Sequence, residues 1–274
     1  VVKFVVEAPL IAKARKAGHF VIVRVGEKGE RIPLTIAAAD VKAGTITLVV
    51  QAVGKSSSKL CALNPGDYIT DVVGPLGRAT HIEKFGTVVC CGGGVGCAPL
   101  LPIVAAMKEA GNRVITVLAA RTKELIILEK QMREYSDELI IMTDDGSYGN
   151  KGLVTQGVEA VINREKVDLC VTIGPAVMMK FVSLLTRKYD IPTVASLNTI
   201  MVDGTGMCGA CRLMVGGEVK FACVDGPEFD GHLVDFDQAM KRQQQYKTEE
   251  GRAKLAYEEG ATHHGGCGHG GGEK

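Results

Sequence analysis

From residue 87 to residue 196 the sequence alternates short apolar runs with stretches of helical periodicity, and no other feature restricts the possible folds as strongly. The apolar runs are rich in valine and isoleucine, and turn residues separate them from the helical stretches. This alternation predicts a parallel α/β sheet with right-handed crossovers. The expected strands are Thr87–Cys91, Val114–Ala119, Leu139–Thr143, Asp168–Ile173 and Thr193–Ser196, and the expected helices are Ala98–Ala110, Glu124–Tyr135, Val154–Ile162 and Ala176–Tyr189.

Residues 1–84 follow a different pattern. Short strand candidates rich in valine and isoleucine are separated by glycine and proline, and no long helical stretch interrupts them. Such spacing is typical of a small antiparallel barrel or sandwich, and we expect a barrel. The candidates are Val1–Val6, Phe20–Val25, Ile46–Val53 and Tyr68–Val73.

The overall composition argues against two kinds of partner. The 274 residues carry 32 lysines and arginines against 31 aspartates and glutamates, whereas a nucleic-acid-binding protein needs a basic excess. The longest uncharged run, Phe85–Met107, is interrupted by glycines and prolines, so it predicts a strand, a turn and a helix rather than a membrane span. We therefore expect neither nucleic acid nor a membrane as a partner.

A glycine-rich turn joins the first strand of the α/β region to its helix, with the sequence Gly92-Gly93-Gly94-Val95-Gly96-Cys97-Ala98-Pro99. Backbone N–H groups and a helix dipole at such a turn favour a pyrophosphate. The pattern is not G-x-G-x-x-G, and Arg121 stands at the end of the next strand in place of an acidic residue. A tight turn without a ligand is the alternative.

Two further segments follow strands of the same sheet, where α/β proteins place ligand groups. The carboxylates of Thr143-Asp144-Asp145-Gly146-Ser147 can accept hydrogen bonds from ribose hydroxyls, although a solvated turn explains them equally well. Gly174-Pro175 follows the fourth main strand, and Met178 can pack on a ring. The sequence thus predicts a nucleotide site at this edge of the sheet.

The barrel region contains two unusual segments, Arg31-Ile32-Pro33-Leu34-Thr35 and Gly74-Pro75-Leu76-Gly77. Leu34 and Thr35 offer an apolar face and a hydroxyl to a flat heterocycle. Gly74 and Gly77 allow close approach to its phosphates. Both segments would also be ordinary as hairpin turns.

The spacing Cys208-x2-Cys211-x11-Cys223 is the most specific chemical signal in the chain. Plant-type 2Fe–2S sites use C-x4-C-x2-C followed by a distant cysteine, and Asp203 stands where the first cysteine would be. A carboxylate can ligate iron through oxygen, and Gly204, Gly206 and Gly209 allow the backbone to fold around a cluster. We therefore expect a 2Fe–2S cluster held by three thiolates and one carboxylate.

Other interpretations of the nine cysteines remain open at this point. Zinc can be bound by the same three cysteines with His232 or Asp203 as the fourth ligand. Three unrelated buried cysteines are the third possibility. No secretory segment is visible in the sequence, so we expect a reducing, cytoplasmic setting in which clustered cysteines bind metal rather than form disulfides. The His- and Cys-rich end, 263–270, is either a further metal site or a solvated tail.

The order of these parts is similar to that of the ferredoxin–NADP reductase superfamily: a barrel, then a domain with G-G-G-x-G-x-A-P and a later G-P. A 2Fe–2S segment after them resembles the electron-transfer subunit of dihydroorotate dehydrogenase B. Further matching motifs are Ala17-Gly18-His19-Phe20, Gly54-Lys55-Ser56-Ser57 and Asp144-Asp145-Gly146-Ser147-Tyr148-Gly149.

Asp203 and the helical extension after His232 resemble one branch, the small subunits of NADH-dependent reduced ferredoxin:NADP oxidoreductase. These belong to electron-bifurcating transhydrogenases and are also described as sulfide dehydrogenase small subunits. The superfamily's R-x-[YF]-[ST] flavin motif has its counterpart in Ile32–Thr35, with Arg31 one place early. The resemblance therefore places Thr35 near flavin N5 but does not assign Arg31 to a phosphate.

The resemblance implies a multidomain protein with four parts: an FAD-binding β-barrel (1–84), an NAD(H)-binding α/β domain (85–197), a 2Fe–2S segment (198–237), and a helical extension with a flexible tail (238–274). It implies FAD contacts from Pro33, Leu34, Thr35, Val50, Gln51, Gly54, Ser56, Ser57, Gly74, Leu76 and Gly77. It implies NAD(H) contacts from Gly93, Gly94, Val95, Gly96, Pro99, Arg121, Asp144, Asp145, Gly146, Gly174, Pro175 and Met178. The implied cluster ligands are Asp203, Cys208, Cys211 and Cys223.

The expected function is hydride exchange between NAD(H) and FAD, followed by single-electron transfer through the 2Fe–2S cluster. The resemblance also implies a larger partner subunit with a second FAD, two 4Fe–4S clusters and the NADP(H) site, and ferredoxin as an indirect partner. Dihydroorotate oxidation is one alternative, which Asp203 and the helical extension disfavour. A sulfide or polysulfide oxidoreductase and a zinc-stabilised nucleotide-binding module are the others.

Overall fold

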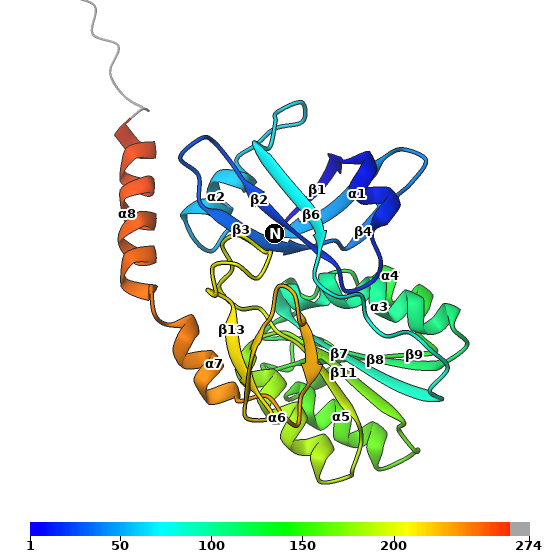
Figure 1. Cartoon of the computed structure of the whole chain (residues 1–274). Helices are drawn as coiled ribbons and strands as arrows, with labels where there is room; N and C mark the ends of the chain where they lie inside the picture. Colours follow the sequence, from blue (N-terminus) through cyan, green and yellow to red (C-terminus); the bar gives the residue numbers. More distant parts are fainter. Residues whose placement is uncertain (264–274) are drawn as a thin grey trace, which may run out of the picture.

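The computed structural model describes residues 1–263 and arranges their strands in four sheets (Figure 1). Two small sheets form the N-terminal part, a seven-stranded sheet forms the centre, and a hairpin carries the cysteine-rich segment. The proposed metal site in the tail falls almost wholly on residues 264–274, outside the described residues. No helix among the described residues has the length and apolarity needed to cross a membrane.

The N-terminal part consists of two antiparallel sheets of three strands each, with strand orders β1-β5-β4 and β3-β2-β6. The strands are β1 (Val2–Glu7), β2 (Phe20–Arg24), β3 (Arg31–Thr35), β4 (Ala38–Asp40), β5 (Thr45–Val50) and β6 (Asp71–Leu76). Two short helices, α1 (Pro9–Ala14) and α2 (Lys55–Cys61), connect them. The sheets share one apolar core, which includes Val21, Val23, Ile36, Ile46, Leu48 and Leu60.

The interpretation of Arg31–Thr35 as a hairpin turn is wrong, because this segment is strand β3. Pro33 argued against a strand in the sequence, because proline has no N–H group to donate to the hydrogen-bond ladder of a sheet. The structure tolerates Pro33 because β3 lies at the edge of its sheet. The predicted strand Tyr68–Val73 also shifts, since β6 begins at Asp71.

The central sheet has the order β10-β9-β8-β7-β11-β12-β15, and its first six strands are parallel. They are β7 (Thr87–Gly93), β8 (Arg113–Ala120), β9 (Glu138–Thr143), β10 (Asn150–Lys151), β11 (Leu169–Ile173) and β12 (Thr193–Ser196). Helices α3 (Cys97–Glu109) and α4 (Glu129–Tyr135) cover the face toward the N-terminal part, and α5 (Val154–Ile162) and α6 (Ala176–Arg187) cover the other (Figure 1). This arrangement confirms the parallel α/β sheet.

The predicted helix Glu124–Tyr135 is wrong in its first turn and a half. Residues Lys123–Leu125 form a 3-10 turn, and α4 begins only at Glu129. Leu128, immediately before α4, has a φ of 60°. A leucine in this left-handed conformation breaks a continuous helix, and its side-chain type gives no sign of it in the sequence.

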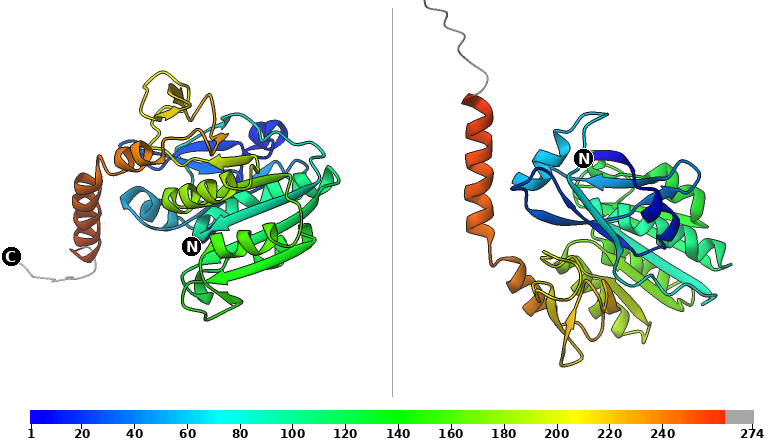
Figure 2. Two further views of the ribbon diagram at one scale, coloured as in Figure 1. Left: turned by 90° about the horizontal axis from the view of Figure 1, so that it is seen from below. Right: turned by 45° about the horizontal axis from the view of Figure 1, so that its top comes forward.

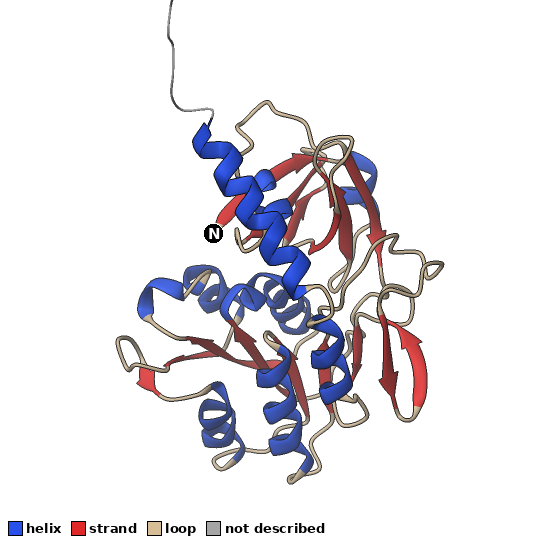
Figure 3. Cartoon of the chain, turned by 90° about the vertical axis from the view of Figure 1, so that its left-hand side faces the viewer, coloured by secondary structure: helices blue, strands red, loops and turns tan. Residues whose placement is uncertain are grey.

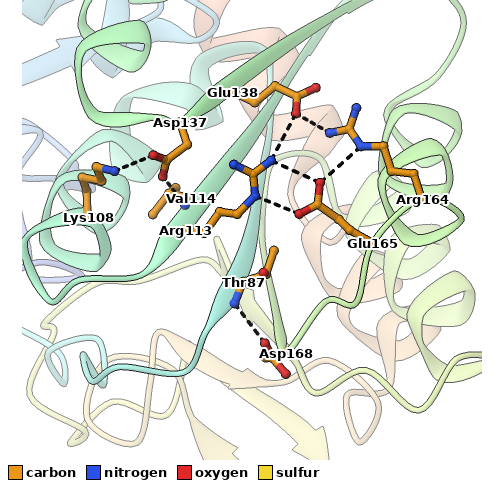
Figure 4. Close-up of polar contacts among 9 residues, drawn as sticks. All are labelled: Thr87, Lys108, Arg113, Val114, Asp137, Glu138, Arg164, Glu165 and Asp168. Atoms are coloured by element: carbon orange, nitrogen blue, oxygen red, sulfur yellow. Dashed lines mark hydrogen bonds and ion pairs between the residues drawn. The ribbon is translucent and has the colours of Figure 1, made fainter.

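Carboxylates hold the amino ends of the parallel strands (Figure 4). Asp168 accepts a hydrogen bond from the N–H of Thr87 at 2.9 Å, and Asp137 accepts one from the N–H of Val114 at 2.8 Å. Arg113 donates to Glu165 at 2.8 Å. These contacts give the amino edge a structural role and leave the opposite, carboxyl edge for ligands.

The cysteine-rich segment is a hairpin of β13 (Arg212–Val215) and β14 (Glu218–Phe221), followed by β15 (Glu228–Asp230). β15 pairs antiparallel with β12 and so becomes the last strand of the central sheet. The chain then continues into α7 (Phe236–Gln243) and α8 (Lys247–His263).

The expected helical extension after residue 238 consists of two helices, because Gln244–Tyr246 separate α7 from α8. α7 packs Phe236 and Ala239 into the core beside the cysteines, whereas α8 leaves the core and lies beside α2 (Figures 2 and 3). The break is therefore a result of tertiary packing, and no glycine or proline marks it.

Candidate functional site

The carboxyl ends of β7, β8, β9 and β11 bring the candidate nucleotide residues to one edge of the central sheet. β7 ends at Gly93, and a 3-10 turn over Gly94–Gly96 leads directly into α3. The loop after β9 is tied to the loop after β8, since the N–H of Asp145 donates to the carbonyl of Arg121 at 3.3 Å. These segments therefore lie together at one edge of the sheet, as the sequence predicts.

Two glycine-containing turns meet at this edge. A Cβ on Gly93 would lie 2.5 Å from the sulfur of Met178, and one on Gly96 would lie 2.7 Å from the carbonyl oxygen of Ile173. Gly94 differs, because its φ is +57° and nothing lies within 4 Å of its Cβ position. The turn is therefore packed tightly from behind and open on the side of Gly94, as a site for a phosphate group requires.

The paired aspartates after β9 have different surroundings. The Asp145 carboxylate accepts hydrogen bonds from the N–H and the hydroxyl of Ser147, at 2.9 and 2.7 Å, and these hydrogen bonds lower its pKa. Asp144 is exposed, and its carboxylate has no hydrogen-bond partner among residues 1–263. Asp145 therefore shapes the turn, whereas Asp144 is the carboxylate that is available to a ribose.

Replacing Asp144 by alanine is expected to raise the KM for NADH about tenfold with little change in kcat, because a hydrogen bond to a charged acceptor contributes about 1.5–3 kcal/mol. Steady-state kinetics with an artificial electron acceptor measure both constants. Asp145→Ala serves as the comparison, and it should lower the melting temperature more than Asp144→Ala does. An unchanged KM in Asp144→Ala would show that this carboxylate does not bind the ribose.

The candidate flavin residues lie along β3, at the end of β5, before α2 and at the end of β6. Thr35 is half-buried at the end of β3, and its hydroxyl has no hydrogen-bond partner among the described residues. The hydroxyl is therefore free to bind a ring nitrogen. Val50 is 2% exposed inside the core of the N-terminal part, so only its backbone can reach a ligand.

The two serines before and within α2 already have partners. The Ser57 hydroxyl accepts from the N–H groups of Val53 and Gly54, both at 3.0 Å, and the Ser56 hydroxyl donates to Glu30 at 2.6 Å. Gly54 has nothing within 4 Å of its Cβ position. Ser57 therefore fixes the start of α2, and the open backbone at Gly54 is the part that can face a phosphate.

Gly74 and Gly77 have a packing role that the sequence did not reveal. A Cβ on Gly74 would lie 2.8 Å from Val21, and a Cβ on Gly77 would lie 2.8 Å from the ring of Phe20 and 3.0 Å from Pro227. Protein atoms fill these spaces. Both glycines thus allow β6 to approach its neighbours closely. This packing role holds whether or not the backbone of either glycine also binds a ligand.

The β13–β14 hairpin explains the spacing of the last two cysteines. Cys211 precedes β13 and Cys223 follows β14 closely, so the pairing of the two strands brings the thiols to 3.2 Å. This separation is longer than a disulfide bond, and both cysteines are reduced. Both are 2% exposed, and burial beside Cys211 raises the pKa of Cys223 to about 12. A cation is needed to stabilise such buried thiols as thiolates.

Asp203 and Cys208 form a second pair. The Cys208 sulfur lies 3.4 Å from Oδ1 of Asp203, and the carboxylate also accepts from the N–H groups of Thr205 and Cys208 at 3.0 and 3.1 Å. These hydrogen bonds lower the pKa of Asp203, so the carboxylate is charged. Gly204 and Gly206, with φ of +79° and +84°, turn the chain between the two ligands.

The donor arrangement fits a binuclear cluster better than a single zinc ion. The four candidate ligands form two pairs, Asp203 with Cys208 and Cys211 with Cys223, and a 2Fe–2S cluster takes two ligands on each iron. Within residues 1–263 no three acidic, histidine or cysteine side chains converge as a mononuclear site requires. His232 instead contacts the hydroxyl of Thr186 on α6 at 3.0 Å.

The loop of residues 203–208, which carries Asp203 and Cys208 and is called the cluster loop below, packs directly on the N-terminal part. A Cβ on Gly204 would lie 2.6 Å from Leu76 and 3.0 Å from Ile22, so only glycine permits this approach. Leu76 ends β6, on which the candidate flavin residues lie. The candidate flavin and cluster sites are therefore in contact through one pair of residues.

Sequence reasoning missed one titratable group at the junction of the three parts. Glu228 on β15 accepts a hydrogen bond from the hydroxyl of Thr80 at 2.6 Å, beneath Gly18 of the α1–β2 loop. Burial raises the pKa of Glu228 to about 7. No motif marks this residue, since its environment comes from segments that are far apart in the sequence.

Comparison with known proteins finds close relatives and a matching family model. A homologue of the dihydroorotate dehydrogenase B (NAD(+)) electron transfer subunit from Thermotoga maritima is 50% identical, covering 93% of this chain and 89% of its own length. An uncharacterized protein in the adh 3′ region of Clostridium beijerinckii is 53% identical, with 96% and 92% covered. The model for the iron–sulfur cluster binding domain of dihydroorotate dehydrogenase B matches residues 198–235.

A solved structure extends the similarity to the whole fold. This structure is that of the NADH-dependent reduced ferredoxin-NADP oxidoreductase, described for its insights into flavin-based electron bifurcation. Its chain is 47% identical in sequence to this one. The two align with a TM-score of 0.89, over 93% of this chain and 92% of the other. These matches confirm the predicted family and its iron–sulfur segment. The chain belongs to the family of dihydroorotate dehydrogenase B-type electron-transfer subunits, which are oxidoreductase subunits with the ferredoxin–NADP reductase fold.

Proposed function

We propose that this chain is the small subunit of a flavin-based electron-bifurcating oxidoreductase. It exchanges a hydride with NAD(H), holds FAD and a 2Fe–2S cluster, and passes single electrons to a larger subunit with a second flavin, 4Fe–4S clusters and an NADP(H) site. Ferredoxin is then an indirect partner. Close similarity over 93% of the chain supports this assignment.

The observation that carries the proposal is the contact between Gly204 of the cluster loop and Leu76 of β6. Electrons that leave a flavin on the barrel need a short path to the iron site, and this contact supplies one through protein in van der Waals contact. It also explains why the loop begins with glycine immediately after Asp203.

Two sets of residues bind the FAD and the nucleotide. Thr35, the backbone at Gly54 and the end of β6 hold the FAD, and the glycine turn before α3, Asp144 and Met178 hold the nucleotide. When bound, the flavin accepts a hydride and releases electrons singly. The protein positions the two rings and excludes water between the barrel and the carboxyl edge of the central sheet.

The outer surface of the cluster loop is the proposed contact with the larger subunit. Met207 is 88% exposed and precedes the exposed ligand Cys208, with Val202 half exposed beside them in the loop. Exposed apolar residues around a redox ligand suit a partner that receives electrons. We also propose a cytoplasmic location, because reduced cysteine ligands require a reducing compartment.

The test uses the full chain, purified anaerobically and mixed with NADH. We expect flavin absorbance to be lost first and the EPR signal of a reduced 2Fe–2S cluster to follow. Artificial acceptors should then be reduced, and no substrate-specific reaction should occur without the partner. A preparation that contains zinc and lacks both chromophores would instead establish the zinc-stabilised module.

The Gly204→Ala variant tests the contact that carries the proposal. The new methyl group strains a positive φ and meets Leu76, so we expect a loss of about 1–3 kcal/mol in stability and slower cluster reduction. Flavin reduction by NADH should keep its rate. Stopped-flow absorbance and freeze-quenched EPR separate the two steps.

Gly206→Ala is the matched control, because Gly206 also has a positive φ but faces Val224 instead of the barrel. It should leave cluster reduction closer to the wild-type rate. Equal slowing in both variants would show that the Leu76 contact has no special part in electron transfer.

A second candidate is the electron-transfer subunit of a dihydroorotate dehydrogenase, which the match of the family model to residues 198–235 favours. The co-purified complex distinguishes the two. Reduction of NAD+ by dihydroorotate would support this candidate, and NADP+ reduction by NADH with reduced ferredoxin would support bifurcation.

A further inference from the structure

A small cleft lies between the cysteine-rich segment and α7. Its polar lining consists of Thr199, Arg212, Arg242 and Gln243, and Ile200 and Leu213 contribute apolar wall. None of its lining residues is acidic. The cleft is therefore a concentration of positive charge without a matching carboxylate.

Both arginines have unused donors. Arg212 donates one hydrogen bond, to the carbonyl of Gly209 at 3.3 Å, and Arg242 donates one, to the carbonyl of Ala210 at 3.3 Å. Neither forms an ion pair with any residue between positions 1 and 263. A guanidinium has five N–H donors, so most of them remain free to bind a ligand.

The size of the cleft limits the ligand. It encloses about 260 Å³, part of which is open to solvent. This space includes open solvent, so the cleft is a shallow site that suits a small ligand. A tetrahedral oxyanion has enough acceptor oxygens for two guanidinium groups, whereas a whole dinucleotide is too large.

We propose that this cleft is an oxyanion site that binds a phosphate group, either free phosphate or the phosphate of a small monoester. Arg212 and Arg242 supply both the charge and the hydrogen-bond donors. The site is separate from the candidate flavin and nucleotide residues, and its existence does not depend on the proposed function. Since Arg212 follows Cys211, an anion held there lies close to the cluster segment.

Isothermal titration of inorganic phosphate into the full chain, in a phosphate-free buffer of low ionic strength, tests the proposal. We expect one site in the wild type, and binding weakened about tenfold or more in Arg242→Gln and in Arg212→Gln. Glycerol 3-phosphate is titrated in parallel, and tighter binding than free phosphate identifies a monoester as the preferred ligand.

Lys241→Gln is the matched control, because it removes the same charge from the neighbouring position of α7 without lining the cleft. Its affinity should stay within about twofold of the wild type. Melting curves verify that each variant is folded, and Arg212, which is exposed, carries the test if Arg242→Gln does not fold. Unchanged affinity in the folded arginine variants, or an equal loss in Lys241→Gln, would overturn the proposal.

Discussion

Cys223→Ser is expected to abolish the iron–sulfur cluster while the flavin remains bound. Cys223 and Cys211 form the buried pair of proposed ligands, so the substitution would leave one iron with a single thiolate. A serine hydroxyl is a harder and far less acidic ligand than a thiol, and it cannot replace the thiolate in a buried setting. Visible absorbance, EPR after reduction and iron content of the purified chain measure the loss.

Cys61→Ser is the matched control for this experiment. Cys61 is a partly buried free cysteine on α2, outside the cysteine-rich segment. The control should keep the iron content of the wild type. A Cys223→Ser protein that retains the full EPR signal would show that another residue completes the ligand set.

Glu228→Gln is expected to remove a pH dependence from the stability of the chain. The pKa of Glu228 is about 7 in the folded protein and about 4.5 in the unfolded chain. Between these values the folded state binds the extra proton, so the free energy of unfolding falls as the pH rises through this window. The difference of about 2.5 units corresponds to at most about 3 kcal/mol.

The variant should therefore be more stable than the wild type above pH 7 and should lose this advantage toward pH 4.5. Its amide can keep a hydrogen bond with Thr80. Melting temperatures of both proteins across this range provide the measurement. Glu218→Gln, which removes a charge from an exposed pair with Lys220, should show no such crossover. A constant difference between Glu228→Gln and wild type at all pH values would contradict a raised pKa.

Sequence patterns predicted the parts of the fold that local periodicity determines. The parallel strands and the helix after the glycine turn follow from alternating apolar and helical segments, and α3 lies within one residue of its expected position at each end. The cysteine spacing likewise predicted a site that the β13–β14 hairpin now explains. In each case the signal lies within a short stretch of sequence.

The missed features depend on contacts between distant segments. β15 is three residues long and is a strand only because β12 lies beside it. The environment of Glu228 combines the α1–β2 loop, Thr80 and β15, and the cleft at Arg242 combines α7 with residues near Cys211. The periodicity of apolar residues and the spacing of motifs carry no information about such long-range contacts.

The pairing of β15 with β12 ties the cysteine-rich segment to the central sheet. The proposed cluster ligands and β15 belong to one continuous segment, so we expect a chain without iron to hold its last strand less firmly. Release of β15 would uncover the backbone of β12, and an open strand edge favours association with other chains. Iron loading would then be a maturation step that protects the central sheet against aggregation before any electron is transferred.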